Sequence, residues 1–308
     1  MPLIPGSVHD MLARPHPVLR ENSKHAVNKN STKWEHMTHF HLSHWKDFTF
    51  VNLYNAFSHI LRRPVGEGQF PGAALPSSYN VQHKSEVKSV SSTYLETLLH
   101  APIVEGVSVL RESSPPSHIP SVTIMSNQLV HTGEPRFQSS LSFLAESNPR
   151  ANLVVSCTRL AQAWHSDDII FLLNGDKNMN PMRQVASYGV HGDTRYAFIL
   201  TNEEVVVVRF FRSDDPETSH QCRAEWRSIP WDASGERVLT PALAIWFLVM
   251  MSLHREHRPI RTRRETLPVN LWWTETGDKG EVTYTHHLSL RKTDTRPPGA
   301  EFRDRPSE

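Results

Sequence analysis

An acidic and a basic side chain, Asp176 and Lys177, follow closely on an apolar run at residues 168–173. The run is rich in isoleucine, leucine and phenylalanine, which is typical of a short buried strand that opens into a loop. An aspartate in that place is often only a turn residue whose carboxylate caps the loop. The chemical alternative is phosphodiester hydrolysis, in which two or three carboxylates hold Mg²⁺ and a lysine or glutamine orients or activates the attacking water. That chemistry requires further partners for Asp176.

Gln184 and Tyr188 are such partners, since they lie one helical turn apart in a helix predicted at 181–190 and would share a face. The runs 169–177, 183–211 and 229–253 follow one another in an order that resembles a family of largely uncharacterised proteins of filamentous fungi with a PD-(D/E)XK nuclease-like domain. The resemblance covers roughly residues 80–290. It implies a single restriction-endonuclease-like α/β domain with a central mixed β-sheet flanked by helices.

In the superfamily that the chain resembles, an acid on the first core helix, an aspartate on the second strand and a D/E-x-K motif on the third strand meet at one edge of the sheet. A helix with Gln-x-x-x-Tyr packs beside them. The resemblance implies that Glu86 is the first-helix acid and Asp176 the third-strand acid, and that both bind Mg²⁺. Lys177 and Gln184 would complete the catalytic group. For Glu86, a solvated surface residue is an equally weighted alternative.

Two positions depart from the family's pattern. Lys177 follows Asp176 directly, so a strand would send the two side chains to opposite faces. Pro120 and Ser121 occupy the Pro-Asp position, and a neutral hydroxyl offers no charge to neutralise Mg²⁺. We therefore expect a degenerate, non-catalytic domain that acts as a binding or accessory module, for example of a biosynthetic gene cluster. The alternative is a Mg²⁺-dependent nuclease with Glu86 and Asp176 as metal ligands, so whether the chain is an enzyme stays open.

The charge balance leaves any nucleic-acid binding to local groups, because 33 basic and 32 acidic residues give a net charge of +1. The candidates are Arg183, near the predicted site, and the arginines Arg261, Arg263 and Arg264, which follow an apolar helix. A solvated loop after a helix C-terminus is the commoner origin of such a cluster, and the sequence names no protein partner. Four histidines between residues 36 and 44 lack a recognised metal-ligand spacing, so a zinc site is disfavoured.

The remaining composition indicates an intracellular protein of the cytoplasm or nucleus. Two cysteines are too few for a disulfide framework, and the N-terminus lacks the apolar core of a secretory signal. The most apolar stretch, 243–251, is shorter than the ~20 residues of a membrane span, so no membrane is expected as a partner. We expect a loosely ordered arm at 1–44, the α/β domain at 45–293 and a disordered tail at 294–308.

The spacing of apolar residues predicts the elements within the domain. Helices are expected at 45–63, 84–100, 181–190 and 241–251, strands at 103–110, 121–125, 152–160 and 168–173, and hairpins at 194–211 and 267–290. This order of helices and strands fits one α/β domain.

Overall fold

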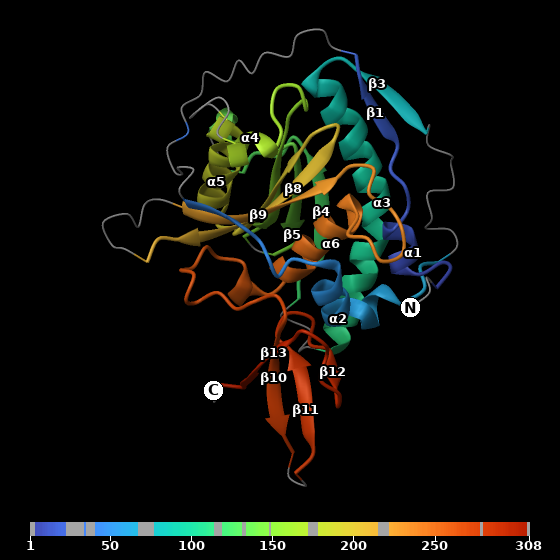
Figure 1. Cartoon of the computed structure of the whole chain (residues 1–308), viewed down its shortest axis with the longest axis vertical. Coiled ribbons are helices and arrows are strands. Elements are labelled where there is room, and N and C mark those ends of the chain that lie inside the picture. The colour runs from blue at the N-terminus through green and yellow to red at the C-terminus, as the bar shows by residue number, and fades with distance from the viewer. Residues whose placement is uncertain are drawn as a thin grey trace.

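A seven-stranded mixed sheet forms the centre of the chain (Figure 1). The computed structural model describes residues 4–22, 34, 41–66, 77–113, 119–130, 134–147, 149–171, 178–214, 222–277 and 280–306. The strand order is β2-β9-β8-β7-β6-β5-β4, with bounds β2 Leu42–His44, β4 Val122–Ser126, β5 Leu141–Ala145, β6 Ala151–Thr158, β7 Tyr196–Leu200, β8 Glu204–Arg212 and β9 Cys222–Pro230. β6 pairs with β7, and β2 with β9, in parallel, while the other neighbours are antiparallel. The predicted α/β architecture with a central mixed sheet is confirmed.

Side chains of each strand alternate between two hydrophobic cores, one on each face of the sheet. In β8, Val205 and Val207 belong to the first core and Val206 and Val208 to the second. Helices α1 (Val8–Leu12), α2 (Phe50–Leu61), α3 (Lys84–Ser113) and α6 (Pro241–Ser252) contribute to the first core. Helix α5 (Asn180–Gly192) and the short α4 (Asp167–Phe171) cover the second core (Figure 1). The sheet therefore lies between two layers of helices.

Every residue of helix α6 is buried, and this agrees with a helix that is apolar on all sides. Thr240 begins it as predicted, since its Oγ1 accepts a hydrogen bond from the Leu243 N–H at 3.1 Å. α6 packs against α3 at Gly106, where an added Cβ would lie 2.5 Å from Sδ of Met250. The described part of the chain contains no helix with the length and apolar character that crossing a membrane would require.

Residues 103–110, predicted as a strand, are instead the second half of α3, which continues through Pro102. Ile103, Val107 and Leu110 recur at helical spacing and are buried. Their β-branched content favoured a strand, but burial of this stripe in the first core outweighs that preference.

Residues 167–171 form helix α4, so the strand predicted at 168–173 is wrong. Asp167 and Asp168 lie in the first turn of the helix, where the exposed backbone N–H groups favour negative charge. The segment 172–177 lies outside the described residues. The predicted strand that would lead to Asp176 is therefore replaced by a helix over its described part.

The predicted loosely ordered arm, 1–44, contributes to the fold where the structure describes it. Helix α1 buries Val8, Met11 and Leu12 completely in the first core. Strand β1 (Val18–Glu21) pairs in parallel with β3 (Ser78–Val81), and β2 adds an edge strand to the main sheet. These described residues are therefore not a loosely ordered arm. Local composition did not reveal this, because the contacts join residues that are far apart in the sequence.

The predicted disordered tail, 294–308, also contains structure. β13 (Glu301–Asp304) pairs in parallel with β10 (Leu271–Thr276). The predicted C-terminal hairpin is confirmed as β10 and β11 (Val282–His286), and β12 (Lys292–Thr293) completes a four-stranded sheet. This C-terminal sheet projects from the main body at the lower end of Figure 1.

Candidate functional site

Strand β6 and helix α5 bring polar side chains together next to Gln184 and Tyr188. Arg159, which follows β6 directly, donates a hydrogen bond to Oε1 of Gln184. Nε2 of Gln184 donates to the hydroxyl oxygen of Tyr188 at 2.5 Å, and this hydroxyl donates to the carbonyl of Gln138 at 2.9 Å. The predicted helix and its shared face for Gln184 and Tyr188 are confirmed. The hydrogen-bonded chain fixes the position of the Arg159 guanidinium.

Arg159 is a buried cation. It is 5% exposed, its Nη1 donates to the carbonyl of Thr158 at 2.8 Å, and its Nε is buried without a hydrogen-bond partner. Its acceptors are an amide and a carbonyl oxygen, and no described carboxylate pairs with it. Removing a charge from water without a counter-ion is strongly unfavourable. The surroundings of Arg159 therefore favour binding of an anion.

The first turn of α3 adds a second cation to this site. Lys84 is exposed, but the surrounding protein removes part of its solvation and thereby lowers its pKa. The nearby charge of Arg159 lowers this pKa further. Cys157 lies two residues before Arg159 on β6 and is 2% exposed. Burial raises the pKa of the Cys157 thiol and of the Tyr188 phenol, so both stay neutral near pH 7. We call Lys84, Cys157, Arg159, Gln184 and Tyr188 the Arg159 cluster.

The Arg159 cluster contains two cations and no carboxylate. Mg²⁺ binds through oxygen ligands, among which carboxylates supply the neutralising charge. Over the ranges that the structure describes, no three His, Cys, Asp or Glu side chains form a group that could hold a metal ion. A guanidinium beside an ammonium group is instead suited to phosphate or carboxylate oxygens. The described side chains of the Arg159 cluster are therefore suited to bind an anion.

Glu86 lies in the same first turn of α3 as Lys84, but its carboxylate caps the helix. Its Oε2 accepts from the backbone N–H of Gln82 at 2.6 Å and of His83 at 3.3 Å. The hydrogen bond from Gln82 is the main reason why the pKa of Glu86 is lowered. His83 directly precedes the helix, so its N–H is among the donors that a helix N-terminus leaves without an internal partner, and Gln82 lies one residue before it. The role of Glu86 as a Mg²⁺ ligand stays a prediction.

Asp176 and Lys177 lie outside the described residues, so their predicted catalytic roles also stay predictions. Helix α5 packs against β6 and β7. The sequence interpretation looked for the site in the segment 168–177 and therefore missed Arg159, which follows β6. The available signal was the Cys157-x-Arg159 spacing at the end of a β-branched run, because residues two apart on a strand point to the same face.

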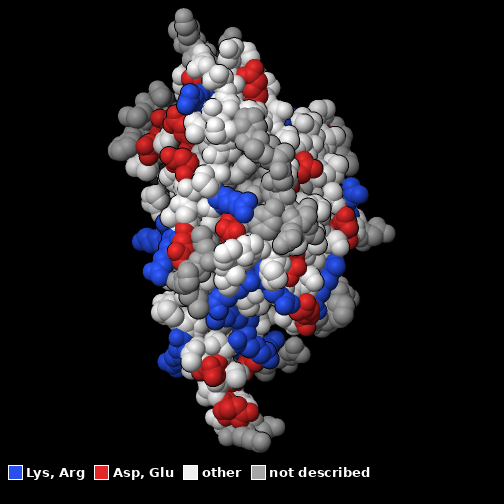
Figure 2. All heavy atoms as spheres, turned by 90° about the vertical axis from the view of Figure 1, so that its right-hand side faces the viewer, with Lys and Arg blue, Asp and Glu red and all other residues white. Residues whose placement is uncertain are grey.

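The arginines predicted to bind nucleic acid have different surroundings. Arg183 is partly buried on α5. Arg263 forms an ion pair with the buried Glu225 and lies 5.0 Å over the ring of Phe211. Arg261 and Arg264 are exposed. Figure 2 shows that lysines and arginines gather on the lower half of one face of the molecule, so positive charge is local despite the small net charge. Nucleic-acid binding stays a prediction.

Comparison with known proteins does not assign this chain to a family. No protein-family model, curated protein or solved structure matches this chain. The resemblance to PD-(D/E)XK proteins therefore has no support from relatives, and the function has to be argued from the geometry of the Arg159 cluster.

Proposed function

We propose that the chain is a degenerate, non-catalytic PD-(D/E)XK-like domain that binds the phosphate groups of a nucleic acid through the Arg159 cluster. The observation that carries this proposal is the buried Arg159 guanidinium, which has no carboxylate partner among the described residues. An anion would replace the solvation that burial removes from the guanidinium.

The order of the elements supports the nuclease-like part of the proposal. Helix α3 is followed by the antiparallel strands β4, β5 and β6, then by α5 and by β7, which pairs in parallel with β6. The resemblance implies this succession of a first helix, three strands and a Gln-x-x-x-Tyr helix. Under this proposal β6 is the third strand of the nuclease-like domain, in place of the segment 168–173.

With β6 as the third strand, Cys157 and Arg159 stand at the acid and lysine positions of a D/E-x-K motif. A neutral thiol in place of the acid removes a charge that Mg²⁺ needs, while a guanidinium in place of lysine keeps the positive charge. Loss of the metal site with retention of phosphate affinity is the expected result. Such a domain holds its nucleic acid without cleaving it.

The test combines cleavage and binding on the same purified protein. Labelled single- and double-stranded DNA and RNA are incubated with Mg²⁺ or Mn²⁺, and binding is followed by fluorescence anisotropy at low and moderate salt. We expect no cleavage, and binding that weakens steeply as salt rises because phosphate contacts dominate. The variant Arg159→Gln should bind at least tenfold more weakly, whereas Arg237→Gln, an exposed arginine, should bind like the wild type.

Three outcomes contradict the proposal. Cleavage that Asp176→Asn abolishes would show a metal-dependent nuclease with a carboxylate site. Absence of binding at low salt, or equal binding by wild type and Arg159→Gln, would remove the Arg159 cluster as the phosphate site. Thermal unfolding of Arg159→Gln shows that the variant is folded, and its midpoint should not fall because the substitution removes a buried charge that no described carboxylate pairs with.

A further inference from the structure

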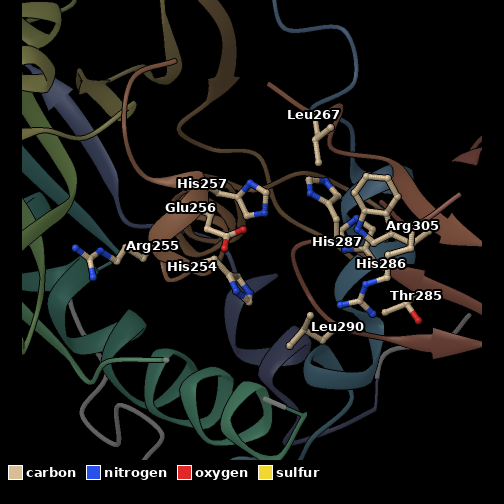
Figure 3. Close-up of a pocket in the computed structure, with 11 residues that line it drawn as sticks. His254, Arg255, Glu256, His257, Leu267, Thr285, His286, His287, Leu290 and Arg305 are labelled. Atoms are coloured by element: carbon tan, nitrogen blue, oxygen red, sulfur yellow. The ribbon is translucent and has the colours of Figure 1, made fainter. Parts of the chain in front are cut away.

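Two hollows of similar volume on the described surface differ in what they offer a partner. The cavity of about 560 Å³ between the short 3-10 helix η6 (Arg255–His257) and the C-terminal sheet has a lining of mixed charge, in which Glu256 and Arg305 come from opposite sides (Figure 3). Such a lining favours no ligand of one charge. The second hollow, of about 540 Å³, is a groove between α3 and β4, at the edge of the main sheet. That edge has the features of an interface.

The groove has apolar side chains on both of its walls. Ile103, Val104 and Val107 line it from α3, and Val122 lines it from β4. Val104 is 50% exposed although it lies beside these apolar neighbours. Arg111, at one end, is bound to the segment before β4. An apolar surface of this kind is stabilised when another surface covers it.

Strand β4 has one side without a partner strand. It is the last strand of the seven-stranded sheet, and over the described ranges no strand pairs with its outer side. The N–H of Glu146 donates to the carbonyl of Ser121 at 2.8 Å, so the odd-numbered residues of this segment bond to β5. Because peptide groups of an antiparallel strand alternate between its two sides, those of Val122, Ile124 and Ser126 point to the outer side. They form a row of donors and acceptors with which a further strand can pair.

The sequence of β4 lacks the usual protection of an edge strand. Its residues, Val122–Ser126, include no charged residue and no proline, and its pairing with β5 has no bulge. Natural edge strands commonly have such features, or are very short, and thereby avoid pairing with a second chain. The opposite edge strand, β2, has only three residues. Of these two edges, β4 is therefore the one suited to accept a further strand.

We propose that β4 pairs in the antiparallel direction with β4 of a second copy of this chain, about a two-fold axis at Ile124. Ile124 then lies opposite its equivalent and Val122 lies opposite Ser126, so that the outer peptide groups of both strands are paired. Val122 and Ile124 pack toward α3, so the two Ile124 side chains meet on the side of the groove. The inference uses no residue of the Arg159 cluster and goes beyond the proposed function.

Charged side chains on the other face of β4 favour the second copy as the partner. The Thr123 hydroxyl donates to Oε1 of Glu146 at 2.5 Å, and Nη1 of Arg150 lies 4.0 Å from Sδ of Met125. Thr123 and Met125 share a face, since they are two residues apart on a strand. In the pairing about Ile124, Thr123 of one copy lies opposite Met125 of the other. Glu146 of each copy is thereby brought beside Arg150 of the other, once on each side of the axis.

The same charges disfavour the neighbouring registers. If Thr123 lay opposite its own equivalent, the two Glu146 carboxylates would come together, and like charges opposite one another are unfavourable. Ser126 would then lie opposite Pro120, which has no N–H to donate. A shift in the other direction would bring the two Arg150 guanidinium groups together. The surface is thus complementary to itself in the proposed register.

Sedimentation equilibrium of the full chain over a range of concentrations tests the inference. We expect the wild type to show an equilibrium between monomer and dimer. Ser126→Pro removes an N–H that bonds only to the second copy, and Ser126 is exposed, so the variant should fold and associate about tenfold more weakly. Ser126→Ala keeps this N–H and should associate like the wild type.

Reversal of the charges tests the choice of partner. Arg150→Glu places like charges on both sides of the axis and should weaken association by about tenfold. Adding Glu146→Arg to this variant exchanges the two charges and should restore association to near the wild-type level. Thermal unfolding of each variant shows that it is folded.

Cross-linking tests the register. Chains with Thr123→Cys, mixed with chains with Met125→Cys, should form disulfide-linked dimers, because the two positions lie opposite one another with Cα atoms about 4.5 Å apart. Each variant alone should cross-link poorly, since its two cysteines are on a diagonal about 7–8 Å long. The native cysteines, Cys157 and Cys222, are buried and do not interfere.

Four results would overturn the inference. A wild-type chain that stays monomeric up to about 0.1 mM would leave this edge to another occupant. Equal association of Ser126→Pro and Ser126→Ala would show that the outer peptide groups of β4 are not the contact. Failure of the charge exchange to restore association, or cross-linking of each cysteine variant alone as rapidly as of the mixture, would exclude the proposed register.

Discussion

Two fully enclosed histidines predict that the fold is acid-sensitive. His16 is 7% exposed and stacks on Trp231, and His286 is completely buried. Burial lowers the pKa of His16 to about 4 and that of His286 to about 3. In the unfolded chain both return to about 6.5. The unfolded chain therefore binds protons that the folded chain refuses, and stability is lost as the pH falls from about 6.5 toward these folded values.

The size of the loss follows from the two pKa differences. At pH 5 an unfolded histidine is almost fully protonated and both folded histidines are almost fully neutral, which makes the free energy of unfolding smaller by about 2 kcal/mol for each residue. Together His16 and His286 contribute roughly 4 kcal/mol between pH 7.5 and pH 5. That is a large share of the ~5–15 kcal/mol that stabilises an ordinary domain. His59 and His257, whose pKa values are lowered to about 4 and about 3, act in the same direction.

Urea unfolding at a series of pH values measures this loss in the wild type and in the double variant His16→Asn and His286→Gln. The side-chain amide of the introduced asparagine replaces the donor from Nδ1 of His16 to Trp231, and that of the introduced glutamine replaces the donor from Nε2 of His286 to Val269. We expect the double variant to lose about 4 kcal/mol less than the wild type over the same interval. His100→Gln, at an exposed position of α3, should follow the wild type. Parallel curves for wild type and double variant would refute the reasoning.

Two further predictions concern helix starts. Thr240→Val removes the cap of α6 and the hydroxyl that donates to the carbonyl of Leu12 at 2.6 Å, so it should reduce the free energy of unfolding by about 2–3 kcal/mol, whereas Thr240→Ser should keep most of it. Urea unfolding compares the two, and equal losses would contradict the capping role. Glu86→Ala should lower the thermal midpoint more than Glu86→Gln, because a glutamine oxygen still accepts from Gln82; calorimetry checks the order, and equal midpoints would argue against the cap.

Elements with strong local signals were predictable from the sequence. Thr240 followed by a proline and an apolar run marks the start of α6, and the turn between β7 and β8 separates two β-branched runs. The helix with Gln184 and Tyr188 was predictable because Pro181 marks its first turn. What these elements share is that neighbours in the sequence decide them.

The features that the sequence did not predict depend on contacts between segments that are distant in the sequence. Residues 103–110 are rich in β-branched side chains and became helical where α3 meets α6. Helix α1 is anchored by a bond from Thr240 to Leu12, which are 228 residues apart. Arg159 was missed because its significance lies in its burial and in its bond to Gln184, 25 residues further on, and neither is visible in a strand-like run.

Buried basic side chains of this fold differ in how they tolerate burial, and this difference bears on what the Arg159 cluster binds. An imidazole avoids the cost of burial by losing its proton, as the lowered pKa values of His257 and His286 show. A guanidinium has no such option, because it cannot be deprotonated in a protein. The neutral histidines therefore need no counter-ion. Arg159 stays charged, so its burial without a described carboxylate partner favours an anionic partner.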